Sequence, residues 1–488
     1  MLTKSLIISH RQCPKRMWLQ VNQPELAVID PSARSRMEDG NHVGDIARQL
    51  HPDGVLISTL NRKQALTETA AVLSGTRRSV FEPAFMADDV LVRVDLLLPD
   101  GDHYRAVEVK SSTSVKPYHL DDLTVQTWVM RKSGLPLSRV SLAHINTQFV
   151  YPGHQDYQGL FHEVDLTAKV EEKIPEVADW VQAAKATLAL DEVPQVVSGP
   201  QCSDPFACPF ASHCKPVEQE VTEYPVEILP RGAKEAIELR KANYRDLREV
   251  PTGILKNEVH VRVHRATVNG QAELDRQASE ILNALPWPRY YLDFETVATA
   301  IPLFAGVRPF EAIPFQWSCH IEQEDGTLSH NEFLAPDGED PRRAFAETLI
   351  NNLGQSGPII VFNQSFEKGR ILYLAELFPD LMPELKKVAD RLFDLLVVAR
   401  EHYYHPDMRG SWSIKSILPT IAPALTYSNL DVGHGMDAQD SYRKMIRPDT
   451  SQADRESLRH ALLEYCQLDT YAMVVVANAF RLGEVDHS

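Results

Sequence analysis

Long apolar runs are missing from this chain of 488 residues. None reaches the ~20 residues that a membrane-spanning helix needs. The first residues, MLTKSLIISHRQCPKR, are too polar for the apolar core of a secretory signal. Internal repeats and low-complexity tracts are absent as well. From these absences we expect a cytoplasmic protein that has no membrane partner.

Cysteine is scarce, with six in the chain, and the tightly spaced cysteine pairs of structural zinc sites are absent. In a large cytoplasmic protein, such cysteines favour metal ligands or free thiols over disulfides. A surplus of positive charge is also lacking, because the formal net charge is −17. That charge argues against broad, nonspecific coating of DNA. It leaves room for clustered acids, which a divalent-metal site requires.

The length exceeds what a single hydrophobic core holds, so we expect an α/β protein of several domains. Strand and helix patterns predict a first domain over residues 1–215 and a second over 286–488. Between them, residues 216–285 predict a helical connector. Its short helices occur in helix-hairpin-helix DNA-binding elements, but a plain connector between domains is the favoured interpretation.

A first set of charged residues lies on a predicted β-hairpin. Residues 89–98 and 104–112 predict two strands joined by the turn PDGD, with a helix over 119–134 after them. Glu108 and Lys110 share one strand face because successive side chains alternate. Asp95 is predicted at the end of the neighbouring strand. The two carboxylates are suitable ligands for Mg²⁺ or Mn²⁺, and Lys110 would orient water or offset charge. Charged residues on a solvated hairpin are the plain alternative.

This pattern resembles the RecB-type branch of the PD-(D/E)xK nucleases, and most closely the CRISPR-associated RecB-like exonucleases. The resemblance rests on His42 in GNHVG, Asp95, Glu108-Val-Lys110 and Gln126 in QTWVM. It implies a restriction-endonuclease-like fold in which His42 is a further metal ligand and Gln126 contacts the substrate phosphate or the site. The family often has Tyr four residues after that Gln, where this chain has Met130. Glu82 is a candidate supporting acid.

Four cysteines bracket this hairpin in the sequence. Cys13 precedes it, and Cys202, Cys208 and Cys214 follow at regular spacing. Four thiolates suit a cluster site. The arrangement resembles the iron–sulfur clasp of the same nucleases, which implies a [4Fe–4S] cluster. The first gap of the trailing trio is longer than is common there, so zinc and free thiols stay open. The two other cysteines, Cys319 and Cys466, are predicted to be ordinary core residues.

A second set of acids lies in the second predicted domain. Asp293 and Glu295 share one face of a predicted strand over 289–297. Tyr465 and Asp469 lie one turn apart on a long predicted helix over 458–480. Glu367 begins a helix between them. Acids that converge from such segments can hold two metal ions, and Tyr465 would position the attacking water.

The order of these residues resembles the DnaQ-like, RNase H-fold 3′→5′ exonucleases of the DEDDy type. In that family the second acid is an Asp after Phe, whereas here Phe366 is followed by Glu367. Asp394 is the rival candidate, although it matches a later segment of the family. Near it, His405, Arg409 and Lys415 are candidate contacts to the phosphate backbone, and are equally typical of ordinary loop residues.

Together, the two resemblances imply a metal-dependent DNA nuclease with two hydrolytic centres, acting on single strands or ends in DNA end processing, repair or defence. A helicase or a defence complex is the implied partner. Two alternatives remain. One is a nucleic-acid-binding scaffold in which one or both folds are inert, suggested by Glu367 and Met130. The other is an exonuclease directed to RNA. The sequence does not indicate an oligomeric state.

Overall fold

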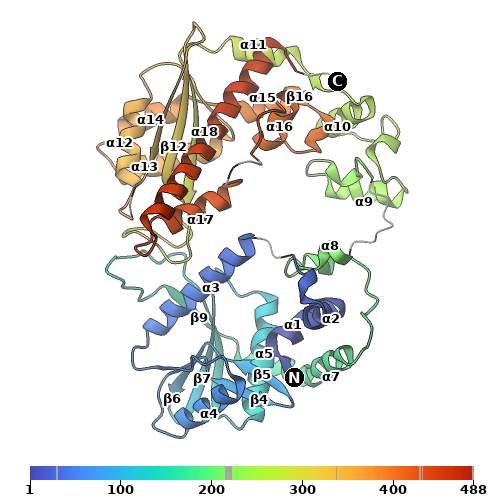
Figure 1. Ribbon diagram of the computed structural model, residues 1–488, viewed down its shortest axis with the longest axis vertical. Coiled ribbons are helices and arrows are strands. Elements are labelled where there is room, and N and C mark those ends of the chain that lie inside the picture. Colours follow the sequence, from blue (N-terminus) through green and yellow to red (C-terminus); the bar gives the residue numbers. More distant parts are fainter. Residues whose placement is uncertain (29–30, 215–221, 337, 428–429, 431, 486–488) are drawn as a thin grey trace. The chain divides into compact units, whose positions relative to one another are not determined.

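The computed structural model describes residues 1–28, 31–214, 222–336, 338–427, 430 and 432–485, with the backbone alone for 31–34. The chain divides into two compact units (Figure 1). Unit 1 comprises Met1–Gln219 and Thr299–Glu311, and unit 2 comprises Glu220–Ala298 and Ala312–Ser488. The segment predicted as a separate connector therefore belongs to unit 2 from Glu220 onward. Both units combine helices with mixed sheets, which confirms the predicted α/β class.

Unit 1 is built on a six-stranded sheet of order β2-β3-β6-β7-β8-β9 and a smaller sheet of order β1-β5-β4. The strands are β1 (Leu2–Thr3), β2 (Val55–Leu56), β3 (Val80–Phe81), β4 (Ala84–Ala87), β5 (Val90–Arg93), β6 (Leu96–Asp100), β7 (His103–Lys110), β8 (Leu137–Ile145) and β9 (Phe161–Asp165). The helices are α1 (Lys4–Gln12), α2 (Pro14–Asn22), α3 (Pro31–Gln49), α4 (Arg62–Leu73), α5 (Pro117–Lys132), α6 (Thr167–Lys173), α7 (Val177–Leu188) and α8 (Ala211–Cys214), with 3₁₀ turns η1 (Pro24–Leu26), η2 (Ile174–Glu176) and η3 (Pro200–Cys202).

The predicted hairpin is present in unit 1. Strands β6 and β7 pair antiparallel, and Gly101 in their turn has a φ of 60°, which glycine adopts at low cost. The run 89–98 was expected to be one strand but forms two. The chain passes from the smaller sheet to the larger one between β5 and β6. At this crossing the backbone N–H of Val94 donates to the carbonyl of Pro83.

Side chains alternate along β7 and thereby define the two faces of the larger sheet. Val107 and Val109 belong to a core with α3, and the loop residues Ala300 and Ile301 complete that core. The opposite face, which includes Ala106, packs against residues of α5 and α7. Glu108 and Lys110 are in register with this second face, so both lie on the side that α5 covers.

Unit 2 is built on a five-stranded sheet of order β13-β12-β11-β14-β15. The strands are β10 (Glu273–Leu274), β11 (Arg289–Val297), β12 (Ile313–Glu322), β13 (Leu328–Leu334), β14 (Ile359–Val361), β15 (Leu392–Asp394) and β16 (Tyr403–Tyr404). The helices are α9 (Ala233–Lys241), α10 (Glu258–Asn269), α11 (Arg276–Asn283), α12 (Arg342–Asn352), α13 (Gln364–Leu377), α14 (Met382–Asp390), α15 (Leu395–His402), α16 (Ile414–Ile421), α17 (Gly435–Met445) and α18 (Gln452–Leu482), with 3₁₀ turns η4 (Val226–Ile228), η5 (Leu247–Glu249) and η6 (Pro406–Met408).

The central strand β11 pairs antiparallel with β12 and parallel with β14, so the sheet is mixed. Tyr290, Leu292 and Phe294 pack with α12, α13 and α14 on one face. Tyr291 packs with α18 on the other face. Figure 1 shows α18 and the α12–α14 group on opposite sides of β12. Because side chains alternate, Asp293 and Glu295 lie on the α18 face.

The predicted connector shares the core of unit 2. Leu239 of α9, Val263 of α10 and Leu282 of α11 belong to the same apolar cluster as Tyr291 and Phe480. Helices α9 and α10 are separated by residues 242–257, which include η5. They are therefore not joined by the short turn of a helix-hairpin-helix element. Among the described residues, no helix has both the length and the apolar character needed to cross a bilayer.

Candidate functional site

Glu108 is the most heavily bonded carboxylate of unit 1. Its Oε1 accepts hydrogen bonds from Lys4 Nζ at 2.8 Å and Lys110 Nζ at 2.6 Å. Its Oε2 accepts from Gln126 Nε2 at 2.7 Å. Asp122 lies 3.7 Å from Lys4 Nζ and 3.3 Å from Lys110 Nζ. Two ammonium groups and two carboxylates thus form one charged cluster beneath α5.

The charges of this cluster act on one another. The ammonium groups of Lys110 and Lys4 outweigh the effect of burial and hold the pKa of Glu108 well below its usual range. The nearby carboxylates, Glu108 foremost, raise the pKa of Lys110. Glu108 is therefore ionised at any physiological pH.

Asp95 has a different environment from Glu108. It is half-buried, and its Oδ2 accepts the backbone N–H of Val109 at 2.7 Å. Burial and the charge of Glu108 raise the pKa of Asp95 to about 7. Lys110 and Lys4 offset this rise only in part, and a bound divalent cation would supply further positive charge.

A pocket of about 570 Å³ opens beside Asp95 and Lys110. Its wall includes Arg48, Arg93 and Glu82, and Glu82 lies 3.5 Å from the Arg93 guanidinium. Glu82 has a φ of 54°, in the left-handed region that is costly for a residue with a side chain. Its backbone N–H donates to the carbonyl of Asp95. Such strain is often found where a backbone is held for function.

Of the two other predicted residues of this site, Gln126 contacts the site, which is one of its two expected roles, and His42 does not line the pocket. Gln126 is fully buried and donates to Glu108 and, at 3.1 Å, to the carbonyl of Arg93. It therefore orients Glu108 and is not exposed for contact with a substrate phosphate. His42 lies exposed on α3, while its neighbours Asn41 and Gly44 line the pocket. The structure does not place His42 in the wall beside Asp95.

The four bracketing cysteines all lie in unit 1, close enough for their thiols to act on one another electrostatically, and we call them the cysteine clasp (Cys13, Cys202, Cys208 and Cys214). Cys13 lies at the junction of α1 and α2, and Cys214 ends α8. Burial raises the pKa of the Cys214 thiol, on which the other three cysteines also act electrostatically. A small core of Trp18, Leu19 and Phe210 packs against Cys208 and Cys214.

The sulfur atoms of the clasp are not tightly grouped. No three of them all lie within 4.8 Å of one another in the described part of the chain. A tetrahedral zinc site holds its sulfurs about 3.8 Å apart, given a Zn–S distance near 2.3 Å. The clasp is therefore wider than a preformed zinc site. The other two cysteines, Cys319 and Cys466, are fully buried.

Unit 2 brings three acids from two distant segments together. Asp293 and Glu295 of β11 and Asp469 of α18 have carboxylate oxygens within 4.8 Å of one another. Burial and mutual repulsion raise the pKa of Asp293 and of Glu295 well above their usual values. Burial also raises the pKa of Asp469. The three acids therefore form an oxygen-rich group that lacks enough positive charge, which suits a divalent cation.

Glu367 lines the same pocket, which has a volume of about 220 Å³. It is 2% exposed, and its Oε2 has no hydrogen-bond partner. Burial and the charges of Asp293 and Asp394 raise its pKa to about 9. The rival acid, Asp394, instead caps α15 through the N–H of Leu396. It also accepts the N–H groups of Asn363 and Gln364, and so shapes the turn that leads to Glu367.

Lys415 and Tyr465 complete the wall of this pocket in unit 2, and Tyr427 bonds to one of its acids. Lys415 Nζ donates to the hydroxyl of Tyr465 at 2.9 Å, and the hydroxyl of Tyr427 donates to Asp469 Oδ1 at 2.6 Å. Burial and the charge of Asp469 raise the pKa of both tyrosines, so both stay protonated. His405 and Arg409, the other two predicted phosphate contacts, flank the η6 turn and are not part of this wall.

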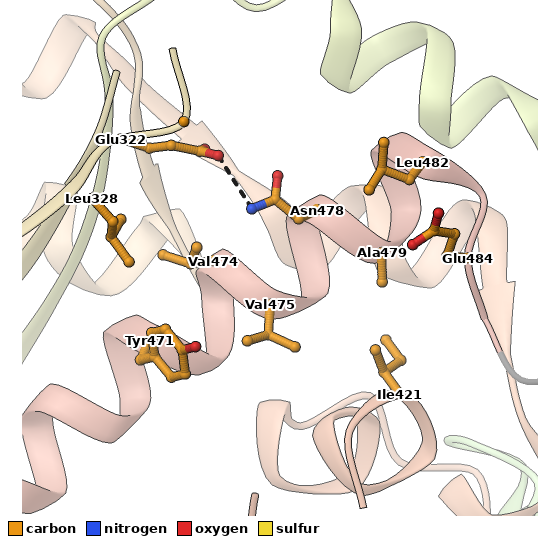
Figure 2. A pocket seen from close by; sticks show the side chains of 11 residues that line it. Glu322, Leu328, Ile421, Tyr471, Val474, Val475, Asn478, Ala479, Leu482 and Glu484 are labelled. Carbon is orange, nitrogen blue, oxygen red and sulfur yellow. Dashed lines mark hydrogen bonds between the residues drawn. The ribbon is translucent and has the colours of Figure 1, made fainter. Parts of the chain in front are cut away.

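A second pocket in unit 2, of about 440 Å³, lies further along α18 (Figure 2). Val474 and Val475 form part of its apolar wall. Its buried acid, Glu322, accepts hydrogen bonds from Asn478 at 3.2 Å and from the Tyr291 hydroxyl at 2.8 Å. Figure 2 shows Glu322 and Asn478 turned toward each other. The acid is thus already paired with neutral donors, unlike Glu367.

Two residues of these sites were missed by the sequence analysis. Lys4 is 104 positions from Glu108, and no local pattern links them. Tyr427 lies in an irregular segment before α17. The one available signal for Lys4 was its place directly after Thr3, a residue that commonly begins a helix, which predicts that α1 starts there.

Comparison with known proteins finds a family model described as a domain of unknown function, DUF2779, over residues 290–413. This range contains Asp293, Glu295 and Glu367 and ends before Tyr465 and Asp469. It covers a quarter of the chain.

Two curated relatives and one solved structure are similar to parts of the chain. An uncharacterized protein of Ureaplasma parvum, UU173, is 25% identical over 46% of this chain and 35% of its own length. Another, MG366 of Mycoplasma genitalium, is 25% identical over 40% of this chain and 32% of its own. The chain thus spans about a third of the length of these relatives. The structure titled "Crystal structure of SSO0001" is 16% identical over 40% of this chain and 78% of its own, with a TM-score of 0.22.

Proposed function

We propose that the protein is a metal-dependent nuclease whose main hydrolytic centre is the group of four acids in unit 2. The observation that carries the proposal is the convergence of Asp293, Glu295 and Asp469 beside the unpartnered oxygen of Glu367. The strand order, with a parallel pair added to an antiparallel meander, supports the RNase H-like assignment. The long helix α18, which brings Asp469 to the central strand β11, also supports this assignment.

The fit to a divalent cation follows from charge. Four acids share this pocket, and the nearby cation, Lys415, is bonded to Tyr465 and to the carbonyl of Gly433. One or two Mg²⁺ or Mn²⁺ ions held by the acids would supply Lewis acidity and an activated water. Tyr465, oriented by Lys415, is placed to hold a water by its hydroxyl, and Tyr427 fixes one oxygen of Asp469.

The pocket also suits a nucleic-acid strand. Phe366 lines it and is 38% exposed, directly before Glu367. An exposed aromatic ring beside a hydrolytic centre provides a surface on which an unpaired base stacks, and such stacking is worth about 1–3 kcal/mol per base. This supports a single strand or a frayed end as the substrate.

For unit 1 we propose the RecB-like assignment, with Asp95 and Glu108 as metal ligands and the cysteine clasp holding a [4Fe–4S] cluster. The wide spacing of the sulfur atoms supports a cluster over zinc, since the thiolates of a cluster bind different iron atoms. One observation favours a second candidate for this unit. Both oxygens of Glu108 already accept hydrogen bonds, which fits a DNA-binding module that no longer cleaves.

The test uses end-labelled single- and double-stranded DNA and matched RNA, with Mg²⁺ or Mn²⁺. We expect cleavage by the wild type and by the control Glu376→Ala, which alters an exposed acid on α13. Asp293→Ala should abolish the activity of unit 2. Adding Asp95→Ala to that variant should abolish the cleavage that remains, which we assign to unit 1. A wild type that cleaves no substrate with either metal refutes the proposal. If the cleavage that remains in Asp293→Ala is not lowered by adding Asp95→Ala, the result favours the DNA-binding role of unit 1.

A further inference from the structure

Helix α1 connects the two features that define unit 1. Its first residue, Lys4, donates to Glu108, and the residue that ends it, Cys13, belongs to the cysteine clasp. The helix has nine residues, so these ends are about 13 Å apart at 1.5 Å per residue. One short, continuous helix therefore separates the clasp from the carboxylate.

The clasp end of α1 is tied to the loop that carries the trailing cysteines. Gln12 Nε2 donates to the carbonyl of Gln201 at 2.8 Å and to that of Phe206 at 2.7 Å. These two carbonyls flank Cys202 and precede Cys208. A movement of the cysteine loop is thus transmitted to the last turn of α1.

The other contacts of α1 hold it against α5, the helix that also donates a hydrogen bond to Glu108. Arg11 Nε donates to Asp121 at 3.0 Å, and Lys4 pairs with Asp122, the next residue along α5. Gln126, about one turn further along the same helix, donates to Glu108. Glu108 is therefore clamped between a donor from α1 and a donor from α5, and its orientation depends on how the two helices sit.

We infer that α1 couples the cysteine clasp to the centre of unit 1, with Lys4 as the positioning residue that α1 delivers to Glu108. This inference rests on the function proposed for unit 1. When the clasp is closed, α1 is held in register and Lys4 clamps Glu108. When the clasp opens, α1 loses its fixed end and the Glu108 carboxylate loses one of its three hydrogen-bond donors, while Lys110 and Gln126 remain bonded to it. The clasp then controls the geometry of the centre as well as the stability of the fold.

The experiment uses the full chain carrying Asp293→Ala, so that activity reports on unit 1. Lys4→Met removes the ammonium group and keeps the length of the side chain, and Lys4→Arg restores a cation. Gln12→Met cuts the tie to the cysteine loop while leaving all four cysteines in place. Lys63→Met, at an exposed site on α4, is the matched control.

We expect Lys4→Met to lower kcat by about 10- to 100-fold, the range for groups that orient metal ligands, with KM for DNA little changed. Lys4→Arg should recover part of that loss. Gln12→Met should lower kcat by less than Lys4→Met does. The double variant Lys4→Met/Gln12→Met should be no slower than Lys4→Met alone, because both substitutions act through the contact between Lys4 and Glu108. If the fold-losses in kcat of the two single variants multiply in the double variant, the two sites act independently and the coupling is overturned.

A second readout does not depend on activity. Coupling between two sites is reciprocal, so loosening the Lys4 end must loosen the clasp end. We expect a chelator to bleach the visible absorbance of the cluster several-fold faster in Lys4→Met than in Lys63→Met. Equal bleaching rates overturn the inference.

Failure of the proposed function gives a different result. A colourless protein, or one in which unit 1 cleaves nothing, refutes that function without deciding the coupling. The coupling is then measured from the rate at which a thiol reagent modifies the clasp cysteines. Faster modification in Lys4→Met than in Lys63→Met supports it, and equal rates overturn it.

Discussion

Glu367 gives the sharpest test of the unit 2 centre, because its burial makes a prediction about stability as well as activity. Its pKa is raised from 4.5 to about 9 in the folded protein. The folded state therefore binds a proton that the unfolded state releases between these two values. The free energy of unfolding falls as pH rises through this window, by about 1.4 kcal/mol per pH unit.

Replacing Glu367 with Gln removes this penalty while keeping the shape of the side chain. About pH 7 lies 2.5 pH units above 4.5, the ordinary pKa of a glutamate, so Glu367→Gln should stabilise the metal-free protein by at most about 3 kcal/mol. Near pH 5 the gain should shrink below about 1 kcal/mol. For a unit of this size, each kcal/mol shifts the unfolding temperature by roughly 2–4 °C.

The assay is thermal unfolding in EDTA and in Mn²⁺ across this pH range, with Glu376→Gln on the same helix as the control. If Glu367 binds metal, adding Mn²⁺ should reverse the order of stability of Glu367→Gln and wild type that is found in EDTA. Glu367→Gln is the more stable protein in EDTA, and it gains less than wild type from Mn²⁺, since a bound ion stabilises only the state that holds it. A stability difference that does not change with pH, or an equal gain from Mn²⁺, would refute the reasoning.

Three further outcomes are expected. Asp95→Asn should flatten the pH dependence of metal-free stability between about pH 4 and pH 7, measured by denaturant unfolding, because the raised pKa of Asp95 makes the wild type lose stability as pH rises there. Tyr427→Phe should lower nuclease turnover by about 10- to 100-fold at saturating Mn²⁺, since Asp469 loses the donor that orients it; unchanged turnover contradicts that role. Gly410→Ala should lower the denaturation midpoint strongly, because Gly410 has a φ of 77° and an added Cβ would lie 1.7 Å from the carbonyl oxygen of Ile228.

Local sequence patterns correctly predicted the features whose contacts are made within a few residues along the chain. The alternation along 103–110 predicted a hairpin with Glu108 and Lys110 on one face, and the helical spacing of Tyr465 and Asp469 placed both on one side of α18. The end of α5 near Gly134 followed from the left-handed conformation that glycine adopts there, with a φ of 81°. In each case the physical determinant lies within a few residues of the feature.

Contacts between distant segments were beyond those patterns. The run 89–98 is mostly apolar on both sides of Arg93 and Asp95, so its pattern does not reveal that the chain changes sheets near Asp95. Gln126 was expected to contact either the substrate phosphate or the site, and only the packing of α5 on the sheet, which buries it against Glu108, decides for the site. The resemblance placed His42 at the metal, whereas the packing of α3 leaves it exposed. These outcomes depend on tertiary packing, which sequence spacing does not encode.

The segment 299–311 has a consequence for how the protein can be divided. It follows β11 directly and supplies Ala300 and Ile301 to the core of unit 1. A fragment that ends near residue 219 would lack these side chains and expose the apolar surface that they cover. The complementary fragment that begins near residue 220 would keep 299–311 attached to β11, but without the rest of the core that covers Ala300 and Ile301. The two units are thus interleaved along one chain, so a truncation that removes unit 2 also takes residues from the core of unit 1.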